Sequence, residues 1–276
     1  MMKTGEYNTL KIDRRTTVGL YLTDGNEDVL LPNKYIPARI DMDEEITVFV
    51  YLDQQERKVA TTLEPKIYLN EFALLKVNYV NEIGAFLDWG LEKDLFVPFR
   101  EQARKMEAGK WYVVYMYLDE KTGRLVASSK LNQFLDNKNL TVSEGDEADL
   151  IVTHITEAGI NVIINEKHKG LLYKNEVFED LRTGDRIIGY IKKIRPDGKI
   201  DVSRRPLGVA NLEQSAQEVY DYLKQNKGFI PLTDKSNPEE IKDLLEMSKK
   251  SFKKAIGILY KEKKVDLRPD GVYLLK

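Results

Sequence analysis

Hydrophobic and polar residues alternate along most of the chain up to about residue 205, with the period of two that is typical of β-strands. The same order of segments occurs three times: a strand, a second strand led by glycine, a third strand ending in Pro or Tyr, a variable segment and a hairpin. From the leading glycine to the end of the third strand there are 13 residues for Gly19–Pro32 and 14 for both Gly84–Pro98 and Gly159–Tyr173. This register predicts three copies of one small β-domain.

Each copy is expected to hold five short strands. The predicted strands lie near 10–13, 17–22, 28–32, 45–52 and 57–61 in the first copy, 72–80, 84–89, 94–98, 110–118 and 124–129 in the second, and 148–155, 159–164, 168–173, 186–194 and 199–203 in the third. In the second copy, one or two helical turns are expected over 100–106, between the third and fourth strands. Closing five strands into a barrel removes exposed edges, so an OB-type barrel fits best, with an SH3-like or Tudor-like barrel as the alternative.

After residues 204–208 the period changes from two to 3.6, which indicates helices. The first predicted helix carries Leu212, Ala216, Val219, Tyr220 and Leu223 on one face. Asn237, Pro238 and Glu240 open a second helix as N-cap, N1 proline and N3 glutamate, and a third begins near Ser248. A hairpin over 265–275 completes a winged helix. The predicted fold is mainly β with a C-terminal α+β domain, divided into domains at 1–64, 66–133, 141–206 and 211–276.

Composition excludes several kinds of chemistry. The 276 residues contain no Cys, which rules out disulfides and thiolate ligands, and only two histidines, His154 and His168, expected to be structural or surface residues. The carboxylates at Asp43 to Glu45 and Glu144 to Asp149 are typical of solvated loops. We therefore expect no enzyme and no metal or small-molecule cofactor. With no apolar run of the ~18 residues that a membrane helix needs, and a polar start, we expect a cytoplasmic protein without membrane partners.

The middle copy carries the family resemblance. Gly84-Ala85-Phe86, Leu95-Phe96-Val97-Pro98 and the closing Val126-Ala127-Ser128-Ser129-Lys130 resemble the S1 RNA-binding domain, a member of the OB class. Three such barrels and a winged helix are similar to the conserved virulence factor B family of bacterial RNA-binding regulators, over essentially the whole chain. The resemblance implies post-transcriptional regulation of gene expression. The usual S1 pattern has Phe two residues after the glycine and His at the end of the third strand, and these places hold Tyr21 and Pro32, Phe86 and Pro98, and Asn161 and Tyr173.

Single-stranded RNA is held by aromatic rings that stack on bases and by cations along the backbone. Strand alternation places Tyr21 and Phe86 in line with their glycines and sends Trp89 to the opposite face, as a core or rim residue. Phe86 is either core or RNA face, and the family pattern favours RNA. The cations near the hairpins either solvate the surface or meet phosphates. The candidate RNA-binding residues are Tyr21, Phe86, Arg124, Lys130, Tyr173, Lys192, Lys193, Arg204 and Arg205.

Charge is distributed unevenly along a chain whose net charge is −2. Residues 1–65 carry a net charge of −4, residues 66–140 carry +1, and residues 248–264, with seven lysines and one glutamate, carry +6. Lys250, Lys254, Lys261 and Lys264 are predicted to form a stripe on the third helix that contacts nucleic-acid backbone without reading bases. A solvated helix face is the alternative reading.

Three functions compete. The first is a regulator that binds single-stranded RNA, and the second is an interaction protein that docks components of the transcription or translation machinery. In either case the winged helix can contact RNA, DNA or protein. An RNA-processing enzyme is the least favoured, because the acidic clusters do not suggest a metal site.

Overall fold

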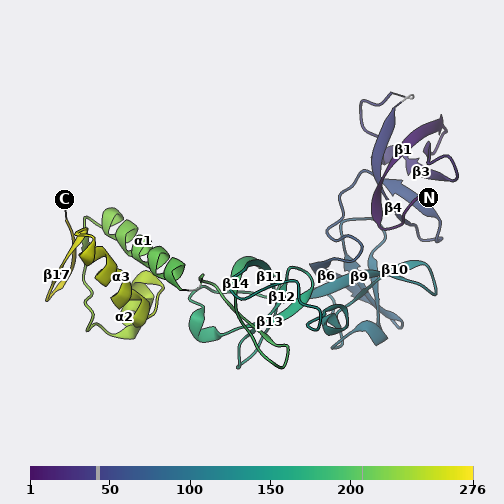
Figure 1. The fold of residues 1–276 in the computed structure, drawn as a ribbon. Coiled ribbons are helices and arrows are strands. Elements are labelled where there is room, and N and C mark those ends of the chain that lie inside the picture. Colours follow the sequence, from purple (N-terminus) through teal and green to yellow (C-terminus); the bar gives the residue numbers. More distant parts are fainter. Residues whose placement is uncertain (42–43, 207, 276) are drawn as a thin grey trace. The chain divides into compact units, whose positions relative to one another are not determined.

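The computed structural model describes residues 1–41, 44–206 and 208–275. Asp43 of the predicted acidic loop and Leu207 of the predicted domain boundary lie outside this range. Two compact units make up the chain, Met1–Leu135 and Asp136–Lys276. The first contains two closed β-barrels, and the second contains a third barrel and a helical domain (Figure 1). The predicted fold class, three five-stranded barrels followed by a winged helix, is confirmed.

The three barrels share one topology, in which the third strand pairs in parallel with the fifth. Barrel 1 consists of β1 (Glu6–Arg15), β2 (Gly19–Thr23), β3 (Asp28–Pro32), β4 (Glu45–Leu52) and β5 (Lys58–Thr61). Barrel 2 consists of β6 (Phe72–Val80), β7 (Gly84–Asp88), β8 (Leu95–Pro98), β9 (Trp111–Asp119) and β10 (Arg124–Ser128). Barrel 3 consists of β11 (Glu147–Ile155), β12 (Ile160–Ile164), β13 (His168–Leu172), β14 (Arg186–Ile194) and β15 (Ile200–Ser203).

The glycine that leads the second strand allows close approach of the third strand. A Cβ atom at Gly84 would lie 2.3 Å from the carbonyl oxygen of Val97, and one at Gly19 would lie 2.1 Å from that of Leu31. The backbones at this corner of the barrel are therefore too close for a side chain. This contact explains why the glycine positions marked the repeat so clearly.

In barrel 2, the segment between the third and fourth strands forms a shorter helix than the one or two turns predicted over 100–106. Only η2 (Phe99–Glu101) forms there, as a 3-10 helix. The buried side chain of Gln102 donates to the Val97 carbonyl at 3.1 Å and accepts from the Met106 backbone N–H at 2.9 Å. These bonds replace the helical ones that would have continued the turn to Met106.

Trp89 lies in a core that joins the two barrels of the first unit. Its side chain is 2% exposed, and its ring makes edge contacts with Phe49 and Tyr51 of β4 at centroid distances of 5.9 and 6.0 Å. The expectation that Trp89 is a core residue is confirmed, although the core it occupies includes residues of both barrels. Because large aromatic rings contribute strongly to burial, this contact holds barrels 1 and 2 together.

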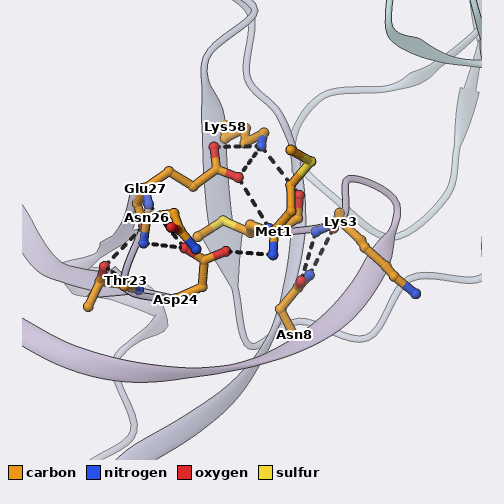
Figure 2. A network of polar contacts seen from close by, with 10 residues as sticks. Met1, Lys3, Asn8, Thr23, Asp24, Asn26, Glu27 and Lys58 are labelled. Carbon is orange, nitrogen blue, oxygen red and sulfur yellow. Dashed lines mark hydrogen bonds and ion pairs between the residues drawn. The ribbon is translucent and has the colours of Figure 1, made fainter.

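The turn between β2 and β3 carries a polar network (Figure 2). The Asp24 carboxylate accepts from the backbone N–H groups of Asn26 and Glu27, and these bonds lower the pKa of Asp24 to about 2. Glu27 in turn binds the Lys58 ammonium at 2.6 and 2.7 Å and accepts from the backbone N–H of Met2 at 3.2 Å. The network ties the turn to β5 of the same barrel.

The helical domain contains α1 (Val209–Gln225), α2 (Pro238–Leu245), α3 (Lys249–Lys261), and a sheet of β16 (Phe229–Ile230), β17 (Val265–Arg268) and β18 (Gly271–Leu274). The predicted capping box at Asn237 is present, and Ser248 caps α3. The sequence pattern missed β16, which is only two residues long. The predicted lysine stripe needs a correction, because α3 ends at Lys261 and Lys264 follows it in the loop before β17.

The described residues also bear on membrane and metal chemistry. No helix among them is long and apolar enough to cross a membrane. They contain no group of three or more His, Cys, Asp or Glu side chains that could hold a metal ion. His168 is 1% exposed and accepts from the backbone N–H of Thr141 at 3.1 Å, which gives it a structural role.

Candidate nucleic-acid interface

Three aromatic rings stack on the outer face of barrel 2. The ladder pairs Phe86 of β7 with Tyr79 of β6 on one side and Phe96 of β8 on the other. The Tyr79 and Phe86 rings lie 4.6 Å apart and within 9° of parallel, and the Phe86 and Phe96 rings lie 5.1 Å apart at 34°. Phe86 is thus the middle ring, and the outer ring Tyr79 is 48% exposed.

The sequence predicted Phe86 at this face but missed Tyr79 and Phe96. A β-bulge between Val77 and Tyr79 shifts the register of β6, so simple alternation along the strand does not place Tyr79 beside Phe86. The same irregularity occurs in the other barrels, where the bulge falls between Ile12 and Arg14 and between Val152 and His154, so it belongs to the shared fold and becomes visible only in the structure.

In barrel 1 the equivalent ring is covered by the protein itself. Tyr21 pairs with Arg14 of β1 and Leu30 of β3, and the Arg14 guanidinium carbon lies 4.3 Å from the centre of the Tyr21 ring. Arg14 donates to the Asp28 carboxylate at 2.8 Å, and the hydrogen bonds to Asp28 and Asp13 raise the pKa of Arg14. One face of Tyr21 is therefore occupied by a cation held by acidic neighbours.

Barrel 3 has no ring at the equivalent position, which is Asn161 paired with His154 and Leu171. Tyr173 lies just after β13, where its hydroxyl donates to Asp201 at 3.3 Å and also contacts the Arg195 guanidinium. The Lys192 ammonium lies 5.8 Å from the centre of the Tyr173 ring. Tyr173 is thus part of a polar cluster rather than of an aromatic stack.

Most of the predicted RNA-binding cations are already paired with carboxylates. Arg124 pairs with Glu56 of barrel 1 at 2.5 Å, and Arg205 pairs with Glu218 of α1 at 3.1 Å. Lys192 contacts Glu176 and Arg204 contacts Glu179 in the same way. Lys130 and Lys193 are exposed, and within the described ranges neither side chain has an ion pair. The pair of Arg124 and Glu56 is exposed on both sides, and such a pair contributes little to stability and can exchange for phosphate, whereas Arg204 and Arg205 are partly buried in theirs.

Within the second unit, barrel 3 and α3 face a common cleft of about 340 Å³. Lys192 and Arg205 come from the barrel side, Lys250 and Lys254 come from α3, and Glu176 is the one carboxylate among the lining residues. The ring of Phe178 also lines the cleft, 5.9 Å from the Arg205 guanidinium carbon. Four predicted cations are therefore brought together on one concave, net positive surface.

A second cleft of about 440 Å³ in the same unit has the opposite charge. Arg204 and Arg205 line it together with the carboxylates of Glu176, Glu179, Glu218, Asp243 and Glu246. Arg205 is shared by the two clefts, where it donates to Ser215 Oγ at 3.0 Å and to the Glu246 carbonyl at 3.1 Å. Arg205 therefore lies between an acidic cleft and a basic cleft.

The two remaining predicted lysines lie at and beyond the end of α3. Lys261 is exposed in the last turn. Lys264 pairs with Glu262 at 2.8 Å, and that hydrogen bond raises the pKa of Lys264. The Lys264 ammonium also lies 5.4 Å from the ring of Tyr220 on α1. Lys264 is the more constrained of the two.

The matching family models agree with this architecture. The S1 domain family matches residues 4–63 and 71–130, and the CvfB-like winged helix domain matches residues 217–274. The uncharacterized protein YitL of Bacillus subtilis is 31% identical over 96% of this chain and 91% of its own length. Conserved virulence factor B of Staphylococcus epidermidis is 28% identical over 93% of this chain and 90% of its own. A multidomain protein with nucleic acid binding domains from Streptococcus pneumoniae is 22% identical over 99% of this chain and 98% of its own, with a TM-score of 0.44.

The matched families are binding domains rather than enzyme domains, and OB-type barrels with a winged helix define a class of nucleic-acid-binding proteins. That class of function is supported by the S1 match and by the ring stack of barrel 2. Within the class, the chain belongs to the conserved virulence factor B family.

Proposed function

We propose that this protein binds single-stranded RNA without chemical conversion and acts as a post-transcriptional regulator of gene expression. The observation that carries the proposal is the stack of Tyr79, Phe86 and Phe96 on barrel 2. A base stacked on an aromatic side chain contributes about 1–3 kcal/mol, and any base can use the same ring. The exposed outer ring of Tyr79 offers that surface, while Phe86 and Phe96 hold it in place.

The basic cleft of the second unit supplies the backbone contacts. Lys192, Lys250 and Lys254 line it beside the ring of Phe178. A cation groove with an aromatic side chain is the combination that binds single strands with little sequence preference. The ion pair between Lys192 and Glu176 can be replaced by one with a phosphate at modest cost because both side chains are partly exposed.

A second candidate function is an adaptor that docks a protein of the transcription or translation machinery. The acidic cleft favours it, since five carboxylates and the side chains of Phe178, Tyr222 and Leu244 suit a basic peptide segment better than a phosphate chain. The two functions differ in the charge of the partner. Competition experiments therefore distinguish them, because a polyanion should compete with RNA for the basic cleft and a polycation should compete with a basic peptide for the acidic cleft.

The test is fluorescence anisotropy of labelled single-stranded RNA with the full chain, over a series of KCl concentrations. Single-stranded DNA of the same sequence and duplex RNA serve as controls. We expect saturable binding to the RNA single strand that weakens as salt increases, with the duplex bound less tightly. The absence of saturable binding to any RNA at low salt would overturn the proposal and leave the adaptor as the better reading.

The regulatory part of the proposal needs a separate test. Crosslinking the protein to RNA in cells and sequencing the recovered RNA should enrich a defined set of transcripts, and deletion of the gene should change the abundance or translation of that set. Recovery of RNA in simple proportion to its abundance, with no transcript changed by the deletion, would contradict regulation without contradicting binding.

A further inference from the structure

Trp111 is the most exposed aromatic ring on barrel 2. The chain has two tryptophans, and while Trp89 is 2% exposed in the core, Trp111 is 54% exposed at the start of β9. Among the described residues, no aromatic ring pair and no cation–π pair involves the Trp111 ring. Burying such a ring against a partner is favourable, and tryptophan is enriched at binding hot spots. An exposed tryptophan on a stable strand therefore suggests a ligand.

The strand register places Trp111 on the same face as the ring stack. Along β7, Phe86 and Asp88 are two residues apart and point to one side of the sheet. Phe86 pairs with Tyr79 of β6, and Asp88 pairs with Lys76 of the same strand. Lys76 pairs in turn with Trp111 of β9. The outer face thus carries aromatic side chains from β8 through β7 and β6 to β9, with a lysine between them.

The spacing suits consecutive nucleotides. Trp111 is one strand away from β6 and two ladder steps from Tyr79, which corresponds to about 5 Å across the strands and about 7 Å along them. An extended single strand can place neighbouring or next-neighbouring bases on two rings at such a separation. The two exposed rings can therefore hold two bases of one strand.

The loop before β9 adds cations at this end of the face. Backbone hydrogen bonds join Gly109 N to Val77 O at 2.8 Å and Val77 N to Lys110 O at 2.9 Å, so the loop lies along β6. Lys105 and Lys110 are exposed on this loop. Lys110 forms an ion pair with Glu107, and both side chains of that pair are exposed to solvent. A phosphate beside a base at Trp111 would meet Lys110, the residue that precedes it in the chain.

The other barrels provide an internal comparison. In barrel 1 the residue at the Trp111 position of the ladder is Glu45, paired with Lys11, and in barrel 3 it is Arg186, paired with Ile151. Neither is aromatic. Barrel 2 alone, among the described residues, combines a ring at this position with the stack around Phe86. The tryptophan is therefore a feature of one barrel and not of the shared fold.

We propose that Trp111 is a second base-stacking platform, which extends the binding face of barrel 2 across β6 onto β9 and takes a base of the same single-stranded RNA that stacks on Tyr79. The proposal rests on the proposed function and goes beyond it by defining the path of the strand. A protein partner at Trp111 is the other occupant that the test distinguishes.

The experiment uses the intrinsic fluorescence of the full chain. An oligouridine of about 16 nucleotides, the upper site size for one OB fold, is added while tryptophan emission and the anisotropy of labelled RNA are followed. Stacking on Trp111 should quench the emission, with the same midpoint as the anisotropy. The variant Trp111→Phe retains Trp89 and should bind RNA with little quenching, which assigns the signal to Trp111.

Affinity gives the second readout. Trp111→Ala should weaken RNA binding by about 5- to 150-fold, the equivalent of 1–3 kcal/mol for one stacked base, and Trp111→Phe should recover most of the loss. Leu118, 39% exposed on the same strand, provides a matched control, and Leu118→Ala should leave affinity unchanged. Thermal melting should be the same for all three variants because both side chains are exposed.

Three results would overturn the inference. If the protein binds RNA but Trp111→Ala binds as well as the unaltered chain and emission does not change, Trp111 is off the RNA path and the proposed function stands. If Trp111→Ala and Leu118→Ala lose affinity equally, the effect is not a stacked base. If the unaltered chain binds no RNA, the proposed function and the inference fail together, and Trp111 is better read as a protein contact.

Discussion

The ring of Tyr79 lies 4.6 Å from the ring of Phe86 and within 9° of parallel to it. The two residues are ladder partners on β6 and β7, next to a bulge that turns Tyr79 onto this face. Stacked cross-strand pairs stabilise a sheet by roughly 0.2–1 kcal/mol, so the pair keeps its geometry before a base arrives. The exposed ring of Tyr79 is therefore preorganised for binding by its half-buried neighbour Phe86.

The first prediction follows from this pair. Tyr79→Ala should weaken single-stranded RNA binding by about 1–3 kcal/mol, because it removes the stacking surface itself. Phe86→Ala should have an effect in the same range, since it removes the support beneath Tyr79. Anisotropy titrations measure both, with thermal melting as the check that the barrel is intact.

The matched control for these variants is Tyr21→Ala. Tyr21 occupies the position of Phe86 in barrel 1, but the Arg14 guanidinium already lies over its ring and the barrel is acidic. We expect a small effect on RNA affinity. An equal loss for Tyr21 and Phe86 would mean that the barrels share the RNA.

Much of the fold could be predicted from local sequence chemistry. The glycines that lead the second strands are required where two backbones nearly touch, and Asn237 and Ser248 are required to cap helices. Each of these constraints acts over a few residues, so each requires a particular residue type at a particular position in the sequence. The barrels and the winged helix could be predicted from these residues together with the repeat.

The site was less predictable because it depends on contacts between distant residues. The bulge that brings Tyr79 beside Phe86 has no simple signature, and the ion pair between Arg124 and Glu56 joins two barrels. The sequence also placed Lys264 on α3, whereas the helix ends three residues earlier. Ion-pair partners and strand register determine which side chains are available to a ligand, and neither can be read from the local sequence.

The second prediction concerns the close backbone approach in barrel 2. Gly84→Ala should destabilise the chain by about 1–3 kcal/mol, because the new methyl group would lie 2.3 Å from the Val97 carbonyl oxygen and force the strands apart. Urea unfolding followed by circular dichroism measures the change. Gly257→Ala in α3 is the control, since it meets no neighbouring atom and should stabilise the helix by about 0.5–1 kcal/mol.

The third prediction concerns pH. The backbone N–H groups of Asn26 and Glu27 lower the pKa of Asp24 from 3.8 to about 2, so the folded state binds the Asp24 proton less readily than the unfolded state does. The contribution of Asp24 to stability is therefore complete above the unfolded pKa and is lost as the pH falls through the folded pKa. Asp24→Asn should be less stable than the unaltered chain at neutral pH, and the difference should shrink as the pH is lowered from about 5 towards 2. A difference in unfolding free energy that stays constant over that range would contradict the assignment.

The fourth prediction separates the four lysines of the predicted stripe by their surroundings. Lys250 and Lys254 line the basic cleft with Lys192, whereas Lys261 lies at the helix end and Lys264 is paired with Glu262. Replacing Lys250 and Lys254 by Gln should lower RNA affinity for all sequences alike and make the slope of log K against log salt shallower by about 1.4, since each phosphate contact on a single strand contributes roughly 0.7.

The double variant Lys261→Gln and Lys264→Gln removes the same charge and is the matched control for that slope. We expect a smaller change in slope, because the ammonium of Lys264 is already paired with the Glu262 carboxylate and neither lysine side chain lines the cleft. Tyr79→Ala should leave the slope nearly unaltered, since a stacked ring releases no counterions. Equal slopes for the two lysine variants would mean that α3 acts through its total charge and not through the cleft. An unaltered slope in both would remove α3 from the RNA path and favour a protein partner for the winged helix.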